Sequence, residues 1–158
     1  MSEEQKMTET EFHKKMAVDL FNLTWELLDK QDRTSEESEK MILTSYSSAY
    51  HWSVIGEPVN LQRGHWLVSR VYIALERAMP AFYNARRCLN LTEANNIGDF
   101  DAAFANEAMA RAYAVLGNKV ESAKYYELAK KAGERIASKE DRDYFFQELD
   151  GGNWFGIR

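Results

Sequence analysis

Residues Asn106–Ala129 (NEAMARAYAVLGNKVESAKYYELA) decide the fold of this chain. Ala110 and Tyr113 fall on one face of a first helix, and Gly117 stands where that helix must turn. Tyr126 recurs at helical spacing on a second helix. Small residues let two helices approach closely, while tyrosines fill the space beside them. The stretch therefore predicts a closely packed antiparallel helix pair.

A weaker copy of the same pattern lies earlier in the chain. Ser69–Leu75 reads SRVYIAL and Ala110–Leu116 reads ARAYAVL, so both contain Arg-x-Tyr-x-x-Leu. The equivalent tyrosines, Tyr72 and Tyr113, are 41 residues apart. The second halves of the copies also match, with Ala81, Ala85 and Cys88 standing where Ser122, Tyr126 and Ala129 stand. Self-similarity at a fixed separation indicates a repeat architecture.

The rest of the chain also favours helix. Its 158 residues include only 8 Gly and 2 Pro, and no stretch shows the two-residue alternation of a strand. We predict an all-α fold of about seven antiparallel helices. They are expected from Thr8 or Thr10 to about Lys30, from about Ser35 to Ile55, from Pro58 to about Glu76, from Met79-Pro80 to about Ala94, from an Asp99 cap to Leu116, from Lys119 to Ala137, and from a Ser138 cap to Leu149.

The two copies resemble the tetratricopeptide repeat, a helix–turn–helix unit of about 34 residues. The resemblance covers about residues 63–136 and implies a right-handed helical array. It divides one domain, 1–158, into parts. These are a degenerate helix pair (1–57), two repeat-like pairs (58–97 and 98–137), a capping helix (138–150) and an irregular tail (151–158).

Several residues depart from the family pattern. Glu76 replaces the turn glycine in the earlier copy, and Ser122 replaces the usual alanine in the later one. The tryptophan expected early in the first helix is absent from the later copy. The chain therefore resembles a divergent member of the family.

The resemblance also implies a binding surface. In the family, the first helix of each pair lines a groove for an extended peptide, through residues two, six and nine positions before the tyrosine. The matching residues here are Arg70, Trp66 and Arg63 in the earlier copy, and Arg111, Glu107 and Phe104 in the later copy. Two arginines beside an aromatic wall suit a carboxylate or a phosphate. The family's clamp for peptide C-termini uses Lys and Asn at several of these places, so the ligand itself does not carry over.

Charge leaves two interpretations of these arginines open. The net charge is −5, yet residues 41–90 hold five arginines and no lysine. They line an anion-binding groove, or they pair internally, as in an Arg70–Glu107–Arg111 ion network. An acidic chain is a poor general nucleic-acid binder, so the expected partner is a peptide or protein segment, acidic or anionic in character.

Two His-Trp dipeptides offer a metal-site hypothesis. His51 and His65 flank the turn near Pro58, where Cys88 or Glu107 could complete a zinc site. The alternative is structural packing, which we favour because paired metal-ligand motifs such as Cys-x-x-Cys are missing. A metal-dependent helical-bundle enzyme would have to bring His13 together with the other two histidines.

A non-enzymatic interaction module is the function that the sequence favours. Nucleophile-elbow and phosphate-loop motifs are absent, and no cofactor is expected. Hydropathy offers no membrane span, no secretory signal precedes the first helix, and a single cysteine fits a reducing compartment, so we expect a soluble, cytoplasmic protein. Homodimerisation through the acidic first helix stays open.

Overall fold

The computed structural model describes residues 4 and 6–157, and within them it contains seven α-helices and no strand. The helices are α1 (Glu9–Asp29), α2 (Ser35–Ile55), α3 (Pro58–Ala74), α4 (Ala78–Ala94), α5 (Asp99–Leu116), α6 (Lys119–Glu134) and α7 (Lys139–Asp150). The predicted all-α fold of seven helices is confirmed. The sixth helix ends three residues earlier than expected.

Side-chain caps explain where four of the helices begin. Thr8, Asn118 and Ser138 each accept a hydrogen bond from the backbone N–H three residues on, at 3.1, 3.1 and 3.3 Å. The Thr34 hydroxyl oxygen does the same for the Glu37 N–H, and the Thr34 backbone N–H in turn donates to the Glu37 carboxylate. These two bonds form a capping box. These contacts satisfy backbone donors that the first turn of a helix leaves unpaired.

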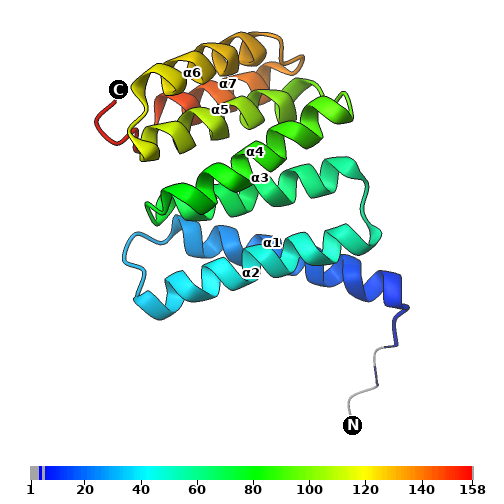
Figure 1. The fold of residues 1–158 in the computed structure, drawn as a ribbon. Coiled ribbons are helices and arrows are strands. Elements are labelled where there is room, and N and C mark those ends of the chain that lie inside the picture. Colours follow the sequence, from blue (N-terminus) through cyan, green and yellow to red (C-terminus); the bar gives the residue numbers. More distant parts are fainter. Residues whose placement is uncertain (1–3, 5, 158) are drawn as a thin grey trace.

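The helices are stacked in chain order, with α1 and α2 at one end and α6 and α7 at the other (Figure 1). Each helix packs against its neighbours in the sequence. In addition, α1 contacts α3, α3 contacts α5, and α5 contacts α7. Within the described residues, α2, α4 and α6 pack only against odd-numbered helices. The odd-numbered helices therefore form one layer, whose surface we call the inner face, and the even-numbered helices form the outer layer.

The two repeat-like pairs share one register of close approach. In the earlier pair, the Ser69 hydroxyl donates to the Ala81 carbonyl oxygen at 3.1 Å. In the later pair, Ser122 donates to the Ala110 carbonyl oxygen at 2.9 Å. Ser69 is equivalent to Ala110, and Ala81 is equivalent to Ser122. The serine is therefore on the first helix in one pair and on the second helix in the other, but the hydrogen bond joins the same two positions of the hairpin. All four residues are buried, so the small side chains bring the helices together in both pairs.

The turns of the two pairs are equivalent as well. Glu76 and Gly117, 41 residues apart, both adopt left-handed backbone conformations, with φ of 56° and 78°. The N–H of the following residue bonds back to the tyrosine carbonyl in each case, at 2.9 Å to Tyr72 and 3.0 Å to Tyr113. These tyrosines also contact an aromatic ring of the preceding outer helix, Tyr46 and Phe82 respectively. The repeat register predicted from the sequence therefore extends to the helix ends.

Helix α5 lies at the centre of the largest hydrophobic cluster. Ten of its residues are buried, because α3, α4, α6 and α7 surround it. Phe145 and Leu149 of α7, and Trp154 beyond it, pack onto this cluster. Helix α7, the expected capping helix, therefore packs beside α5 in the layer of odd-numbered helices, and with the segment after it buries part of α5.

One predicted cap has a different role. Asp99 is the first residue of α5, with φ of 56°, and Gly98 holds the cap position. The Asp99 carboxylate accepts the backbone N–H of Ala137 at 2.9 Å, so it fixes the turn between α6 and α7.

None of the described helices combines the length and apolar character that crossing a membrane requires.

Candidate functional site on the inner face

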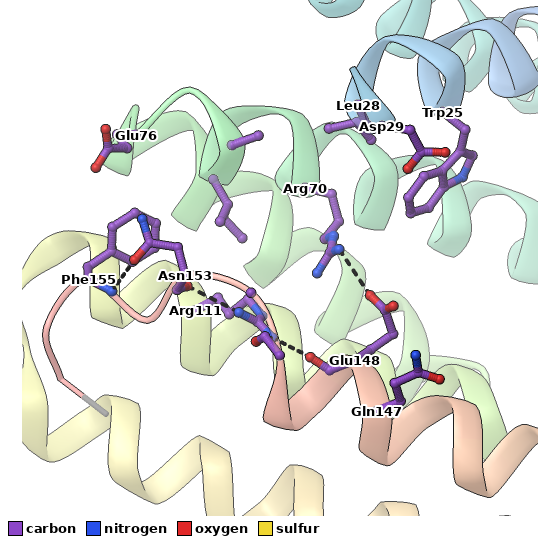
Figure 2. Close-up of a pocket in the computed structure, with 14 residues that line it drawn as sticks. Trp25, Leu28, Asp29, Arg70, Glu76, Arg111, Gln147, Glu148, Asn153 and Phe155 are labelled. Carbon is purple, nitrogen blue, oxygen red and sulfur yellow. Dashed lines mark hydrogen bonds and ion pairs between the residues drawn. The ribbon is translucent and has the colours of Figure 1, made fainter. Parts of the chain in front are cut away.

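A pocket of about 510 Å³ lies on the inner face, and we call it the C-terminal pocket (Figure 2). Its walls come from the last turns of α1 with Trp25 and Asp29, from α3 with Arg70 and Ala74, and from the segment after α7 with Asn153. Every helix that lines it is odd-numbered. The stacking of the array therefore creates a hollow where α1, α3, α5, α7 and the segment after α7 meet.

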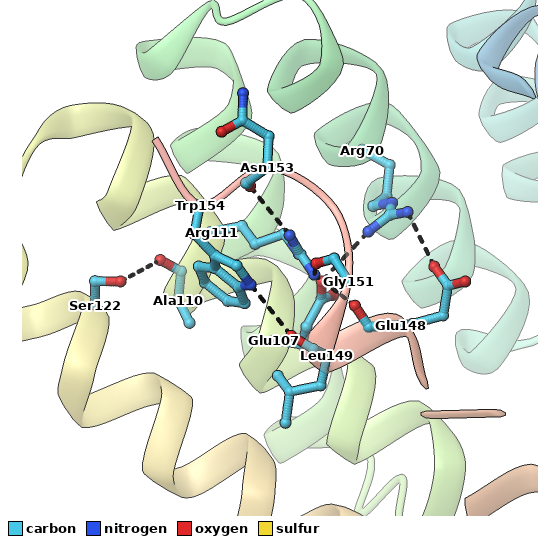
Figure 3. Close-up of polar contacts among 10 residues, drawn as sticks. All are labelled: Arg70, Glu107, Ala110, Arg111, Ser122, Glu148, Leu149, Gly151, Asn153 and Trp154. Atoms are coloured by element: carbon cyan, nitrogen blue, oxygen red, sulfur yellow. Dashed lines mark hydrogen bonds and ion pairs between the residues drawn. The ribbon is translucent and has the colours of Figure 1, made fainter. Parts of the chain in front are cut away.

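Arg111 holds the C-terminal segment against α5 (Figure 3). Its guanidinium donates to three backbone carbonyl oxygens, those of Glu148 at 2.7 Å, Gly151 at 3.0 Å and Asn153 at 3.1 Å. It also lies 4.1 Å from the centre of the Trp154 ring, and the Trp154 indole N–H donates to the Leu149 carbonyl. A planar guanidinium with five donors suits such a set of partners. The Arg111 guanidinium therefore uses its donors and its ring contact to fix residues 148–154.

Four charged side chains form a compensated network beside that segment. Glu107, which is fully buried, accepts from Arg111 Nε and, at 3.3 Å, from Arg70. Arg70 also donates to Glu148 at 3.4 Å. The network contains two positive and two negative groups. Arg70, Glu107 and Arg111 thus make the contacts of an internal ion network. Arg70, whose side chain is 19% exposed, lines the pocket wall, as do Arg111 and Glu148.

The rim of the C-terminal pocket is acidic. Asp29 and Glu76 line it, and neither makes an ion pair with any described residue. Gln147 adds an amide to the wall. Because both arginines of the pocket are already paired, its available polar groups are mainly hydrogen-bond acceptors.

A second, smaller hollow of about 270 Å³ lies between α1, α3 and α5, and we call it the aromatic pocket. Phe21, Trp66, Phe100 and Phe104 form its walls. Arg63 lies at its edge, where Nε and one terminal nitrogen donate to the two carboxylate oxygens of Asp101, both at 2.9 Å. This bond raises the pKa of the Arg63 guanidinium, so the pair stays ionised.

The six groove residues expected from the sequence are thus divided between three places. Arg63, Trp66 and Phe104 line the aromatic pocket, and Arg70 and Arg111 line the C-terminal pocket. Glu107 is fully buried and lines neither pocket.

Sequence reasoning missed the contributions of α1 and of the chain end. Phe21 and Trp25 stand one helical turn apart on α1, so an aromatic pair at i, i+4 spacing was the available signal. Trp154 and Phe155, two aromatic residues inside the glycine-rich segment after α7, were the signal for the other wall.

Two of the three histidines bond to each other, and the third bonds elsewhere. His13 and His51 share a hydrogen bond of 2.9 Å between their Nδ1 atoms, across α1 and α2. His65 instead donates from Nδ1 to Asn84 on α4, at 3.0 Å. Asn84 donates its amide to the Pro80 carbonyl, which leaves its oxygen free to accept. The contacts thus link His51 to α1 and His65 to α4, whereas the metal-site hypothesis requires these two histidines to share one site.

Burial controls the chemistry of the remaining titratable candidates. It lowers the pKa of His65 and of His51, and the nearby His13 adds to the effect at His51. It strongly raises the pKa of the Cys88 thiol, which is fully buried. A thiol in that state is a poor nucleophile and a poor metal ligand. Within the described part of the chain, no three His, Cys, Asp or Glu side chains gather as a metal site.

Comparisons with protein-family models, with curated proteins and with solved structures give no match for this chain.

Proposed function

We propose that the chain is a non-enzymatic interaction module of the tetratricopeptide type, which binds a peptide segment in the C-terminal pocket of its inner face. The observation that carries the proposal is the pocket itself. Its volume of about 510 Å³ and its walls from α1, α3, α5 and the segment after α7 suit several residues of an extended chain.

The charges in the pocket favour a peptide over a small anion. Arg63, Arg70 and Arg111 all have carboxylate partners, so an added phosphate or carboxylate would compete with Asp101, Glu107 and Glu148. The available groups of Asp29, Glu76 and Gln147 can instead accept the N–H donors of a peptide. We therefore expect inorganic phosphate to leave the melting temperature unchanged, whereas a bound peptide should raise it.

Selection from a random peptide library displayed on phage tests the proposal. Ala74 is exposed and lines the pocket, so Ala74→Trp should fill the pocket while leaving the core intact. Ala94 is an exposed alanine at the end of α4, outside the pocket, and Ala94→Trp is the matched control. Peptides selected on the wild type should lose at least tenfold in affinity for Ala74→Trp and bind Ala94→Trp normally.

Enrichment of no peptide, or of peptides that bind both variants equally, would contradict the assignment of this pocket. Melting curves of both variants show whether each is folded before binding is compared.

A further inference from the structure

We propose that the aromatic pocket is a separate site for one uncharged aromatic ring that carries an amide or carbonyl group. The pocket shares no lining residue with the C-terminal pocket, so this inference does not depend on the peptide proposal. Three observations support it: the arrangement of the rings, the charge at the edge, and two buried polar atoms without protein partners.

The rings already stand at the angles that aromatic clusters prefer. Phe104 meets Trp66 edge to face, with centroids 5.5 Å apart and an interplanar angle of 72°. Phe100 lies 4.6 Å from Phe104. Phe21, from α1, also lines the pocket. A volume of about 270 Å³ between such walls accommodates one further ring, which would gain offset or edge-to-face contacts.

The edge of the pocket is polar but carries no net charge. The bidentate contact with Asp101 uses two nitrogens of Arg63 and neutralises its charge. The arginine side chain is 52% exposed, and its remaining N–H groups bond to no described acceptor. A carbonyl oxygen can accept from these N–H groups, whereas a carboxylate would also be repelled by Asp101. The edge therefore favours a neutral acceptor.

Two polar atoms in the wall lack partners among the described residues. They are Oε1 of Gln62 and Nε1 of Trp66. The orientation of the Gln62 amide is fixed, because its nitrogen donates to Thr92 Oγ1 at 3.0 Å and to the Asp101 carbonyl oxygen at 3.1 Å.

Both atoms are shielded from solvent in this arrangement. Because two hydrogen bonds hold the Gln62 amide in place, a small displacement of the Trp66 ring is what lets a ligand reach them. An amide in the pocket could donate to Gln62 and accept from Trp66. Such pairing would favour an amide over an apolar substituent, because buried polar groups strongly prefer a partner.

Benzamide is the probe for this site, and benzoate is its charged counterpart of nearly equal shape. Protein NMR titration should show saturable benzamide binding, with shifts centred on Gln62 and on residues 100–104. Benzoate should bind several-fold more weakly. The double variant Arg63→Met/Asp101→Asn removes both charges of the ion pair, so no unpaired charge remains. It should lower the affinity for benzamide about tenfold.

Two controls keep the result interpretable. Arg77→Met removes an arginine outside the pocket and should leave benzamide binding unchanged. Ala74→Trp, which blocks the C-terminal pocket, should also have no effect. Absence of saturable binding, or equal binding by the wild type and the double variant, would overturn the site. Tighter binding of benzoate than of benzamide would overturn the assignment of an uncharged ligand.

Discussion

At the residue scale, Arg111 links α5 to the end of α7 and the segment after it through hydrogen bonds and a cation–π contact. It pairs with a fully buried carboxylate, stacks on Trp154 and holds three carbonyls of the chain end. Such a residue cannot release its partners to bind a ligand without leaving the buried Glu107 with only its longer contact to Arg70. The later-copy arginine is therefore architectural in this structure, and the surface available for binding lies on α1, α3 and the C-terminal segment.

Replacing Arg111 should destabilise the protein strongly. Arg111→Met keeps the apolar stem but leaves Glu107 without its closest cation, so we expect a loss of about 3–5 kcal/mol in the free energy of unfolding. Urea denaturation measures this loss. Arg87→Met, at an exposed arginine, is the control and should change stability little.

A double variant separates charge from packing. Glu107→Gln/Arg111→Met removes both members of the pair, so its loss should be smaller than the sum of the two single losses. Strict additivity would show that the two side chains do not act together.

The histidine pair should make stability depend on pH. The native pKa of His51 lies below the ordinary value of 6.5, because burial and then the charge of His13 disfavour its protonated form. His65 is shifted in the same direction by burial. The unfolded chain therefore binds more protons near pH 6, and stability should fall as the pH drops from about 7.5 to about 5.5.

Melting temperatures at those two pH values test this expectation. The wild type should melt lower at the acidic value. His13→Gln removes the neighbouring charge and should reduce the difference, while the contribution of His65 should persist. A melting temperature that is higher at the acidic value would contradict the proposed direction of both pKa shifts.

At the element scale, the two repeat-like hairpins have the same backbone arrangement, formed by different residues. Their hydroxyl bonds, left-handed turn residues and tyrosine contacts all coincide after a shift of 41 residues. Sequence predicted this register because small residues and tyrosines recur at helical spacing. It predicted a capping helix at residues 138–150. It did not predict the bonds from Arg111 to the carbonyl oxygens of Glu148, Gly151 and Asn153, because these partners lie far from Arg111 in the chain.

The turn residues allow a reciprocal test of this equivalence. Glu76 has a left-handed backbone that costs a residue with a Cβ atom about 1 kcal/mol or more, whereas Gly117 avoids the cost. Glu76→Gly should therefore stabilise the fold by about 0.5–1 kcal/mol, and Gly117→Ala should destabilise it by about 1 kcal/mol. Chemical denaturation of both variants measures the two changes. Effects of the same sign would show that the turns are not equivalent.

At the scale of the whole molecule, the array places two hollows on one face. The odd-numbered helices line both hollows. In the C-terminal pocket, Arg70, Arg111 and Glu148 of the ion network and the segment after α7 also line the wall. Five of the six groove residues that the family resemblance implied line one or the other of these two pockets, and Glu107 lines neither. Their separation into two pockets was not predictable from the sequence, because it depends on Phe21 and Trp25 of α1 and on the segment after α7.

The most direct test of the account is to map a selected peptide on the isotope-labelled protein by NMR. Binding in the C-terminal pocket should change backbone shifts at the C-terminal turns of α1 and α3 and at residues 151–155, with the exposed outer-layer residues Tyr50 and Tyr83 unaffected. Shift changes concentrated on α2 and α4, with the C-terminal pocket unchanged, would contradict the claim that the inner face is the binding surface.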